Sequence, residues 1–347
     1  MSNVYFKKVS QNTSVKEVNA ITKELLDRII KEENIKLGKK IPLKVHFGEI
    51  GNETYIKAEN FDGIIDYLAE KNIESCFMET SVLYGGQRKN RELHLKTAKE
   101  HNFTRLPVII ADGEQGENFA EVEINKTHFK TCKIGKDFLD YDQYIVLSHF
   151  KGHMLSGFGG AIKQLGMGYA SKGGKLAMHV GMKPKLIERK CKKCHLCEPR
   201  CNENAITIGE HSFIDYDKCV GCGACFAVCP NKAVTIYSFR RILKMIGIGN
   251  PFQQKLVEYA YAAQKDKKNI YINFLMSITG GCDCESKKMK LLLKDIGIFV
   301  STDPVAIDKA CHDMAKRHGK DFKGAPTFKY ANKIGFGSTQ YSLIEVQ

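Results

Sequence analysis

The sequence predicts an α/β protein, with mostly parallel sheets and flanking helices, that carries an inserted α+β module. Two observations indicate this class. Short apolar runs alternate with helical patterns near both ends of the chain, which is typical of a parallel sheet covered on both faces. Between these parts, residues 186–238 hold eight of the thirteen cysteines. We therefore expect residues 1–185 and 239–347 to form one α/β body, with 186–238 inserted as a separate module.

The first region opens with a helix. Ser14 and Glu17 form a capping box, and apolar residues follow at helical spacing as far as Ile30. Helices are also predicted at 61–70 and 88–101, and strands at 43–47, 75–78, 107–111, within 121–134 and at 144–147.

Polar residues follow several of these strands. Because the carboxyl ends of parallel strands meet at one edge, where ligands bind, we expect these residues to form one rim of a cleft. They are His46, Glu49, Glu79, Thr80, Tyr84, Arg88, Asp112, Glu114, His149 and His153.

Residues 152–174 are rich in glycine, including Gly159 and Gly160, and carry Lys163, Lys172 and Lys175. Glycine lets backbone N–H groups approach an anion closely, and lysine neutralises its charge. The segment is not a Walker loop, because the Gly-Lys-Ser/Thr ending is missing. Apolar residues between the glycines predict a buried, ordered segment rather than a flexible loop.

The module contains two copies of an iron–sulfur signature. In each, a Cys-x-x-Cys-x-x-Cys run is followed by a fourth cysteine, which in two-cluster ferredoxins ligates the other cluster. The signature therefore predicts one 4Fe–4S cluster on Cys191, Cys194, Cys197 and Cys229, and a second on Cys219, Cys222, Cys225 and Cys201. A zinc ribbon is the alternative, since Cys-x-x-Cys pairs also bind zinc. Matching short strands are expected at 205–208 and 233–236.

The α/β pattern resumes after the module. A helix is predicted at 252–263, strands at 270–274 and 296–300, and a last helix from Asp303-Pro304 through Lys316. Cys282 and Cys284 lie in a glycine-flanked turn, where they could bind a soft metal, act as a redox pair or pack as thiols. Cys76, Cys132 and Cys311 stand in apolar surroundings and are expected to be inert.

Composition limits the function classes. No stretch approaches the length of a membrane span and no signal peptide is evident, so we expect a protein of the reducing cytoplasm with no membrane role. Lysine and arginine exceed aspartate and glutamate by 53 to 39, a net charge of +14. The positive residues are scattered lysines without an aromatic–arginine patch, which argues against nucleic-acid binding and favours an acidic redox partner or an anionic small molecule.

Four motifs stand out in the two parts of the α/β body. They are His149-Phe150-Lys151-Gly152-His153, Gly157-Phe158-Gly159-Gly160-Ala161-Ile162-Lys163, Gly281-Cys282-Asp283-Cys284 and Thr302-Asp303-Pro304-Val305-Ala306-Ile307-Asp308. These motifs resemble the iron–sulfur-centre proteins of domain-of-unknown-function family 362, and the resemblance covers nearly the whole chain. It implies a 4Fe–4S protein whose reaction is not generally assigned.

The glycine-rich segment also resembles the nickel-pincer lactate racemase family. Lys163 follows His153 by ten residues and precedes His179 by sixteen, in the order of that family. The resemblance implies an acid/base role for His153, cofactor attachment at Lys163 and nickel ligation by His179. The Asp-x-Thr-Arg and Gly-Thr-His-Arg turns of that family are missing, so a shared fold and pocket are implied rather than racemase activity.

Together these patterns predict an iron–sulfur redox protein, with an oxidoreductase as the main hypothesis. The clusters would relay electrons to a pocket in which Lys163 holds an anion with Gly159 and Gly160, and His153 transfers protons. A pure electron carrier and a non-redox enzyme with a pincer-type or mononuclear metal cofactor are the alternatives. The residues expected in the pocket or at this second metal site are His149, His153, Lys163, His179, Asp112, Cys282 and Cys284.

Overall fold

A central sheet organises the body of the protein. The computed structural model describes residues 1–179, 183–201, 203–219, 221, 223–235 and 251–347. Within them, eight strands lie in the order β16-β1-β15-β14-β7-β2-β3-β4. Their bounds are β1 Ser2–Lys8, β2 Leu43–Lys44, β3 Phe77–Glu79, β4 Val108–Ile110, β7 Ile145–His149, β14 Ile270–Leu275, β15 Gly297–Ser301 and β16 Tyr341–Glu345. The predicted mostly parallel sheet is confirmed, because only β15 runs antiparallel to its neighbours β1 and β14.

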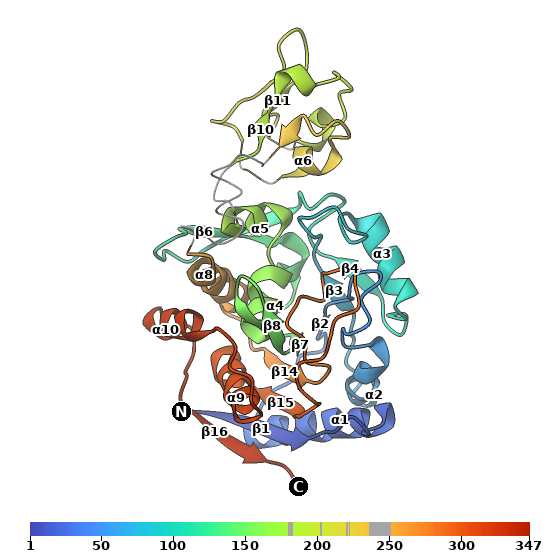
Figure 1. Cartoon of the computed structure of the whole chain (residues 1–347), viewed down its shortest axis with the longest axis vertical. Helices are drawn as coiled ribbons and strands as arrows, with labels where there is room; N and C mark the ends of the chain where they lie inside the picture. Colours follow the sequence, from blue (N-terminus) through green and yellow to red (C-terminus); the bar gives the residue numbers. More distant parts are fainter. Residues whose placement is uncertain (180–182, 202, 220, 222, 236–250) are drawn as a thin grey trace.

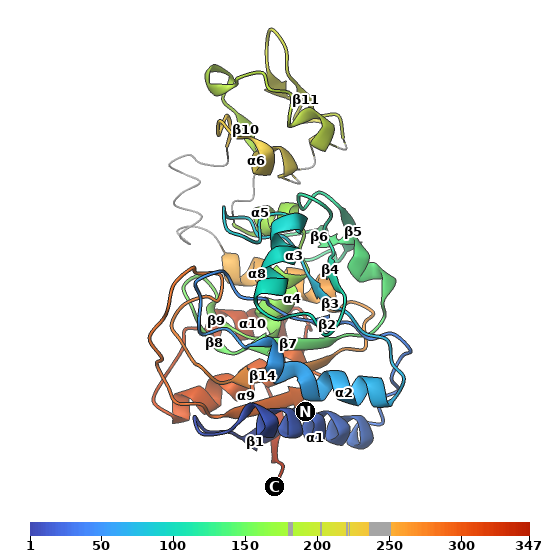
Figure 2. The same ribbon diagram turned by 90° about the vertical axis from the view of Figure 1, so that its right-hand side faces the viewer.

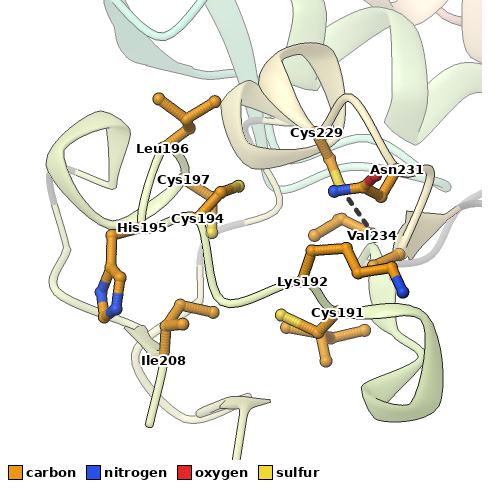
Figure 3. Close-up of a pocket in the computed structure, with 12 residues that line it drawn as sticks. Cys191, Lys192, Cys194, His195, Leu196, Cys197, Ile208, Cys229, Asn231 and Val234 are labelled. Carbon is orange, nitrogen blue, oxygen red and sulfur yellow. Dashed lines mark hydrogen bonds between the residues drawn. The ribbon is translucent and has the colours of Figure 1, made fainter.

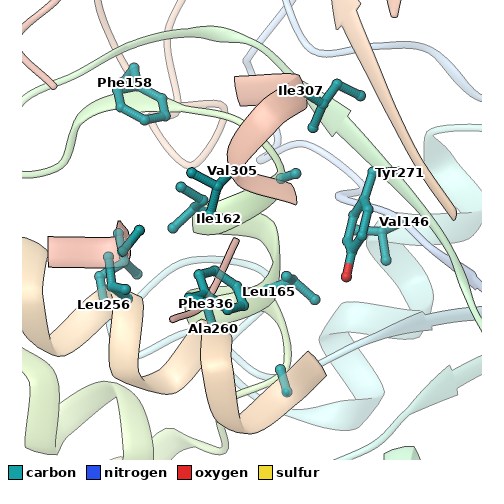
Figure 4. Packing of buried hydrophobic residues seen from close by; sticks show 14 of the residues in the cluster. Val146, Phe158, Ile162, Leu165, Leu256, Ala260, Tyr271, Val305, Ile307 and Phe336 are labelled. Carbon is teal, nitrogen blue, oxygen red and sulfur yellow. The ribbon is translucent and has the colours of Figure 1, made fainter. Parts of the chain in front are cut away.

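Helices cover both faces of this sheet (Figures 1 and 2). Along β14, Ile270 and Ile272 pack into the core beneath the helices α1, α2 and α3, whereas Tyr271 packs into the core on the other face. The second core includes residues of α4, α8, α9 and α10, and Figure 4 shows part of it. The bounds are α1 Val15–Glu32, α2 Asp62–Glu70, α3 Arg91–Glu100, α4 Ala161–Gly168, α5 Lys172–His179, α8 Phe252–Gln264, α9 Pro304–Arg317 and α10 Ala325–Lys333.

Local signals located most of these elements correctly. The capping box of α1 forms, with the Ser14 hydroxyl accepting the Glu17 N–H. Asp303 caps α9 by accepting the N–H groups of Val305 and Ala306 at 2.8 and 3.0 Å. Residues 121–134 differ from expectation, because they form the hairpin β5 (Phe119–Glu123)–β6 (Thr131–Gly135) outside the central sheet.

The glycine-rich segment is an ordered part of the fold. It forms the hairpin β8 (Lys151–His153)–β9 (Gly157–Gly159), followed by α4 and α5. Glycine disfavours helix, but here it permits close packing. A Cβ at Gly166 would lie 2.6 Å from the carbonyl oxygen of Leu256 in α8. The predicted burial is observed for Phe158, Ile162 and Leu165 but not for Met154, which is 88% exposed between the two strands of the hairpin. Tertiary packing explains the two helices.

The cysteine-rich module lies at one end of the molecule, beyond α5 (Figure 1). Its described residues include α6 (Ala224–Val228) and two small antiparallel pairs, β10 (Lys185–Leu186) with β13 (Val234–Thr235) and β11 (Ile206–Thr207) with β12 (Phe213–Ile214). The two expected strands are thus present, although Ile236 lies outside the described residues. Leu176 of α5 packs against Phe226 of α6, which joins the module to the body.

Within the residues that the structure describes, none of the helices has the length and apolar character needed to cross a membrane.

Candidate functional site

A large cavity of about 400 Å³ lies where the carboxyl ends of β2 and β3 meet α4 and α5. The predicted rim contributes several of its lining residues, namely His46, Glu79, Thr80, Tyr84, Arg88 and His153. Lys163, His179, Cys282 and Cys284 line the same cavity. Strand ends that are distant in the sequence therefore converge on one space with the glycine-rich helices.

Other expected rim residues lie elsewhere. Asp112 is buried, and its Oδ1 accepts the N–H of Ser81 at 2.8 Å, so it supports the loop after β3 rather than facing the cavity. Burial raises the pKa of Asp112 to about 6. Glu114 pairs at the surface with Arg91 at 3.0 Å. Asp112 was expected in the pocket, but it is not among the residues that line the large cavity.

Charged side chains form the floor of the cavity. Lys44 Nζ lies 2.8 Å from Glu79 Oε1, and both side chains are almost fully buried. Arg88 Nε lies 3.4 Å from Glu49 Oε2, and Arg88 also donates to the Tyr84 hydroxyl. Buried charges require partners because desolvation is costly, so this network holds the floor in one arrangement. Sequence reasoning missed Lys44, because a lysine within an apolar strand gives no local sign of its partner.

Lys163 projects from α4 into the cavity. Burial lowers the pKa of Lys163 to about 8, and the neighbouring charge of Lys151 acts in the same direction. Its Nζ lies 3.6 Å from Cys282 Sγ. The buried Asp308 fixes the start of this helix, because its carboxylate accepts the N–H groups of Ala161 and Ile162 at 2.7 and 2.9 Å.

Gly159 and Gly160 line a much smaller adjoining cavity of about 30 Å³, together with Lys163 and His149. A Cβ at Gly160 would lie 2.3 Å from Asp308 Oδ1. Glycine is therefore needed at this position to let the helix reach its carboxylate cap. This packing role accounts for Gly160 without a direct ligand contact.

His153 and His179 reach the large cavity from two different elements, β8 and α5. Burial lowers the pKa of His153 well below its usual value and that of His179 to about 4, so both rings are neutral. His153 Nδ1 accepts the N–H groups of Leu155 and Ser156, each at 3.2 Å. The His179 ring lies against Phe252, with centroids 4.7 Å apart.

His149 occupies a structural position beside the cavity. Its Nδ1 lies 3.0 Å from Asp283 Oδ2, and its Nε2 lies 2.8 Å from the Met276 carbonyl oxygen. Lys151 Nζ also contacts Asp283 at 2.6 Å. Burial alone would raise the pKa of Asp283, but His149 and Lys151 hold it well below its usual range.

The turn after β14 brings Cys282 and Cys284 together as a disulfide. The Cys282 N–H donates to Glu285 Oε1 at 2.9 Å, and the Asp283 carbonyl accepts the Glu49 N–H at 2.9 Å. Asp283 therefore points inward, while the cysteines on either side of it line the large cavity.

The cysteine runs line two separate cavities in the module. One, shown in Figure 3, is lined by Cys191, Cys194, Cys197 and Cys229. The other is lined in part by Cys201, Cys219, Gly221 and Cys225. Cys222 lies outside the described residues. In both cases, the fourth cysteine of one run accompanies the first cysteines of the other.

Two corresponding positions in the described residues of the two runs have left-handed backbone. Lys193 and His195 have φ of 52° and 58°, and the corresponding Gly221 and Gly223 have φ of 70° and 81°. Left-handed backbone suits glycine and costs other residues about 1 kcal/mol or more. The repeat predicted from cysteine spacing thus extends to the turn geometry, although the first run lacks glycine.

Among the described part of the chain, no three His, Cys, Asp or Glu side chains converge as the ligands of a single metal ion do. The cysteine cavities are compatible with this finding, because the four thiolates of a 4Fe–4S cluster bind different irons and surround the cluster. Of the residues expected at a mononuclear site, His153, His179, Cys282 and Cys284 line the large cavity, whereas Asp112 and His149 have other partners. Asp112 faces Ser81, and His149 is paired with Asp283.

A comparison of the sequence with known protein families gives an independent result. The family described as "Domain of unknown function (DUF362)" matches residues 41–313, most of the chain, so the chain belongs to this family.

Curated relatives match only short segments. Ferredoxin YfhL of Escherichia coli is 42% identical over 52 residues, which are 13% of this chain and 60% of that protein. Pyruvate synthase subunit PorD of Methanocaldococcus jannaschii is 44% identical over 55 residues, 15% and 64% of the two chains. One component of an ion-translocating oxidoreductase complex from Methanosarcina acetivorans is 45% identical over 47 residues, 13% and 18%. The chain thus covers less than two thirds of each relative.

Two solved structures are similar over more of the chain. The lactate racemase apoprotein from Thermoanaerobacterium thermosaccharolyticum aligns with 80% of this chain and 51% of its own, at 12% identity and a TM-score of 0.39. A protein from Thermotoga maritima aligns with 89% and 60%, at 13% identity and a TM-score of 0.42.

Proposed function

We propose that this member of the DUF362 family is a cytoplasmic iron–sulfur oxidoreductase, in which two 4Fe–4S clusters pass electrons to the large cavity of the body. The arrangement of the cysteines carries this proposal. The two cysteine runs have ferredoxin spacing and line two cavities. Cys229 of the second run lies at the cavity of the first run, and Cys201 of the first run lies at the cavity of the second. The names of the short-segment relatives, a ferredoxin and two components of redox enzymes, support the same role.

The residues present fit the clusters. Cys191, Cys194, Cys197 and Cys229 would hold the first, and Cys219, Cys222, Cys225 and Cys201 the second. When bound, the clusters would supply single electrons. Backbone N–H groups donate to two of the sulfurs, from Ala205 to Cys201 at 3.2 Å and from Val234 to Cys229 at 3.5 Å. Such bonds stabilise thiolates and tune a cluster's potential.

The packing of α5 supports electron delivery to the body. Leu176 contacts Phe226, which follows Cys225, and also contacts Leu83, which lines the large cavity. A Cβ at Gly223 would lie 3.8 Å from Leu176, so the turn of the second run also lies against α5. The second cysteine run is thus connected to the cavity through packed side chains.

Within the cavity, Lys163 would bind an anionic small molecule. Lys175 is already satisfied, since its Nζ donates to Thr80 Oγ1, the Ser81 carbonyl and the Ala170 carbonyl. Among the described residues, Lys163 Nζ has a hydrogen-bond contact only with Cys282. A carboxylate or phosphate beside Lys163 would complete its coordination, and His153 on the same wall would exchange protons with the bound molecule.

The experiment compares Lys163→Met with Lys96→Met, a lysine exposed on α3. Anaerobically purified protein would be assayed for iron, sulfide, zinc and nickel, then reduced and mixed with a panel of small carboxylates. We expect about eight irons per chain. Cluster reoxidation by one member of the panel should be retained in Lys96→Met and lost in Lys163→Met with iron unchanged.

Other outcomes would contradict parts of the proposal. About four irons, or zinc in their place, would refute the assignment of two clusters. Equal reoxidation of wild type and Lys163→Met would leave a pure electron carrier, which needs a redox partner protein but no cavity. Nickel in stoichiometric amount would favour a pincer-type enzyme, because His153, Lys163 and His179 line one cavity.

A further inference from the structure

Cys282 and Cys284 differ from the other cysteines outside the two cluster runs. Cys76, Cys132 and Cys311 are buried free thiols. Burial raises the pKa of Cys76 to about 11, so that thiol is unreactive near neutral pH. Cys282 and Cys284 are joined as a disulfide and both line the large cavity. They are therefore accessible to a reaction in the cavity, while the other three are not.

The surrounding structure holds this pair in a fixed position. Asp283, between the two cysteines, is anchored by Lys151 at 2.6 Å and by His149 at 3.0 Å. The Cys282 N–H donates to Glu285 at 2.9 Å. Because these contacts hold Asp283 and the Cys282 N–H independently of the sulfur–sulfur bond, we expect the turn to keep its position when the bond opens. A bond that is not needed to hold the turn is free to open and close.

Lys163 lies next to one of the two sulfurs. Its Nζ is 3.6 Å from Cys282 Sγ, within hydrogen-bonding distance for sulfur. A neighbouring ammonium group stabilises a thiolate, which is the form that reacts and the form released when a disulfide is reduced. The arrangement therefore favours opening of the bond with negative charge on Cys282.

We propose that Cys282 and Cys284 are a redox-active disulfide that collects two electrons at the cavity. The inference rests on the proposed cluster function and extends it by identifying the acceptor within the body. The sulfur–sulfur bond breaks as it takes two electrons, one from each reduced cluster, and two protons from solvent or the cavity wall complete the two thiols. Each cluster carries single electrons, whereas a disulfide is a two-electron couple. The pair would convert one-electron delivery into a two-electron reductant.

The test uses the full-length, cluster-containing protein purified without oxygen. The clusters are reduced by deazaflavin photoreduction, the sample is treated with iodoacetamide, and the peptide containing residues 282–284 is analysed by mass spectrometry. We expect this peptide to be unlabelled before reduction and doubly labelled afterwards. A reductive titration should consume about four electrons per chain, against about two in the Cys282→Ser/Cys284→Ser variant with its iron content unchanged.

The iron content of the wild-type protein and a parallel experiment on apoprotein separate the possible failures. Low iron in the wild-type protein would contradict the proposed function itself, whatever the state of the peptide. Normal, reducible clusters with a peptide that stays unlabelled would overturn only the disulfide proposal, as would labelling before reduction. Apoprotein, under the same photoreduction, should show no labelling. If apoprotein is labelled equally, the disulfide is reduced without the clusters and the relay is refuted.

Discussion

The exchange of the fourth cysteines between the two runs can be tested by counting iron alone. Cys229 lines the cavity of Cys191, Cys194 and Cys197, although it follows the second run in the sequence. We expect Cys229→Ala to lose the cluster of that cavity, because alanine has no ligand atom. Iron should fall from about eight to about four per chain.

Double variants determine which cluster is lost. If Cys229 and Cys191 serve the same cluster, Cys229→Ala/Cys191→Ala should retain about the same four irons as Cys229→Ala. If Cys219 serves the other cluster, Cys229→Ala/Cys219→Ala should retain almost none. Anaerobic iron and sulfide assays give both counts, and electron paramagnetic resonance of the reduced protein should show one remaining signal in the first variant and none in the second.

The opposite pattern would refute the reasoning. Retention of four irons in Cys229→Ala/Cys219→Ala, with loss of all iron in Cys229→Ala/Cys191→Ala, would mean that each run binds its own cluster. Cys201→Ala is the matched control, because it removes the corresponding cysteine of the other run. It should lose additional iron with Cys191→Ala and not with Cys219→Ala, since Cys201 lines the cavity of Cys219.

Three further predictions concern the frame around these sites. Asp308→Asn should lower the free energy of unfolding by about 1–3 kcal/mol in denaturant titrations, since one buried N–H at the start of α4 loses its acceptor. Burial raises the pKa of the Asp308 carboxyl from 3.8 to about 7, so the folded protein binds the carboxyl proton more tightly than the unfolded chain does. The free energy of unfolding of the wild type therefore falls as pH rises between these two values. The stability difference between Asp308→Asn and wild type should therefore depend on pH, and a constant difference from pH 5.5 to 8 would contradict this. Gly166→Ala should lower the free energy of unfolding by about 1–3 kcal/mol in the same titrations, because the added Cβ would lie 2.6 Å from the Leu256 carbonyl oxygen. An unchanged unfolding midpoint would argue against the tight contact between α4 and α8. Gly223→Ala should speed iron release to a chelator, since its φ is 81°, whereas Gly209→Ala, with no neighbour within 4 Å, should match wild type.

Sequence reasoning succeeded where the signal is local. The capping box of α1, the aspartate cap of α9 and the apolar strand β14 each depend on residues close together in the chain. The convergence of strand ends at one rim also followed from the parallel arrangement, and it correctly placed His46, Glu79 and Arg88 around one cavity. These features need only the local sequence pattern and the parallel arrangement of the strands.

Features that depend on distant partners were missed or misplaced. Strands β1 and β16 pair Ser2 with Tyr341, a contact that no local pattern indicates. Asp112 was assigned to the pocket because it follows a strand, but the orientation of its carboxylate toward Ser81 is set by the neighbouring loop. His149 was considered a possible ligand, and its pairing with Asp283 joins residues 134 positions apart. A residue's type and spacing predict what it can do, whereas its partner determines what it does.

The pairing of β10 with β13 has a consequence for how such a chain can change over generations. Lys185 lies opposite Thr235, so the two ends of the segment between them lie side by side. On the body, His179 and Phe252 flank this part of the chain, and their ring centroids are 4.7 Å apart. Adjacent antiparallel strands are about 5 Å apart, a gap that one or two residues can bridge. A gene segment coding for the module could therefore be gained, lost or exchanged as a cassette without breaking the strands of the central sheet. The body and the cysteine-rich module are in that sense separable inheritances, and a replacement module has only to match the spacing of its two ends.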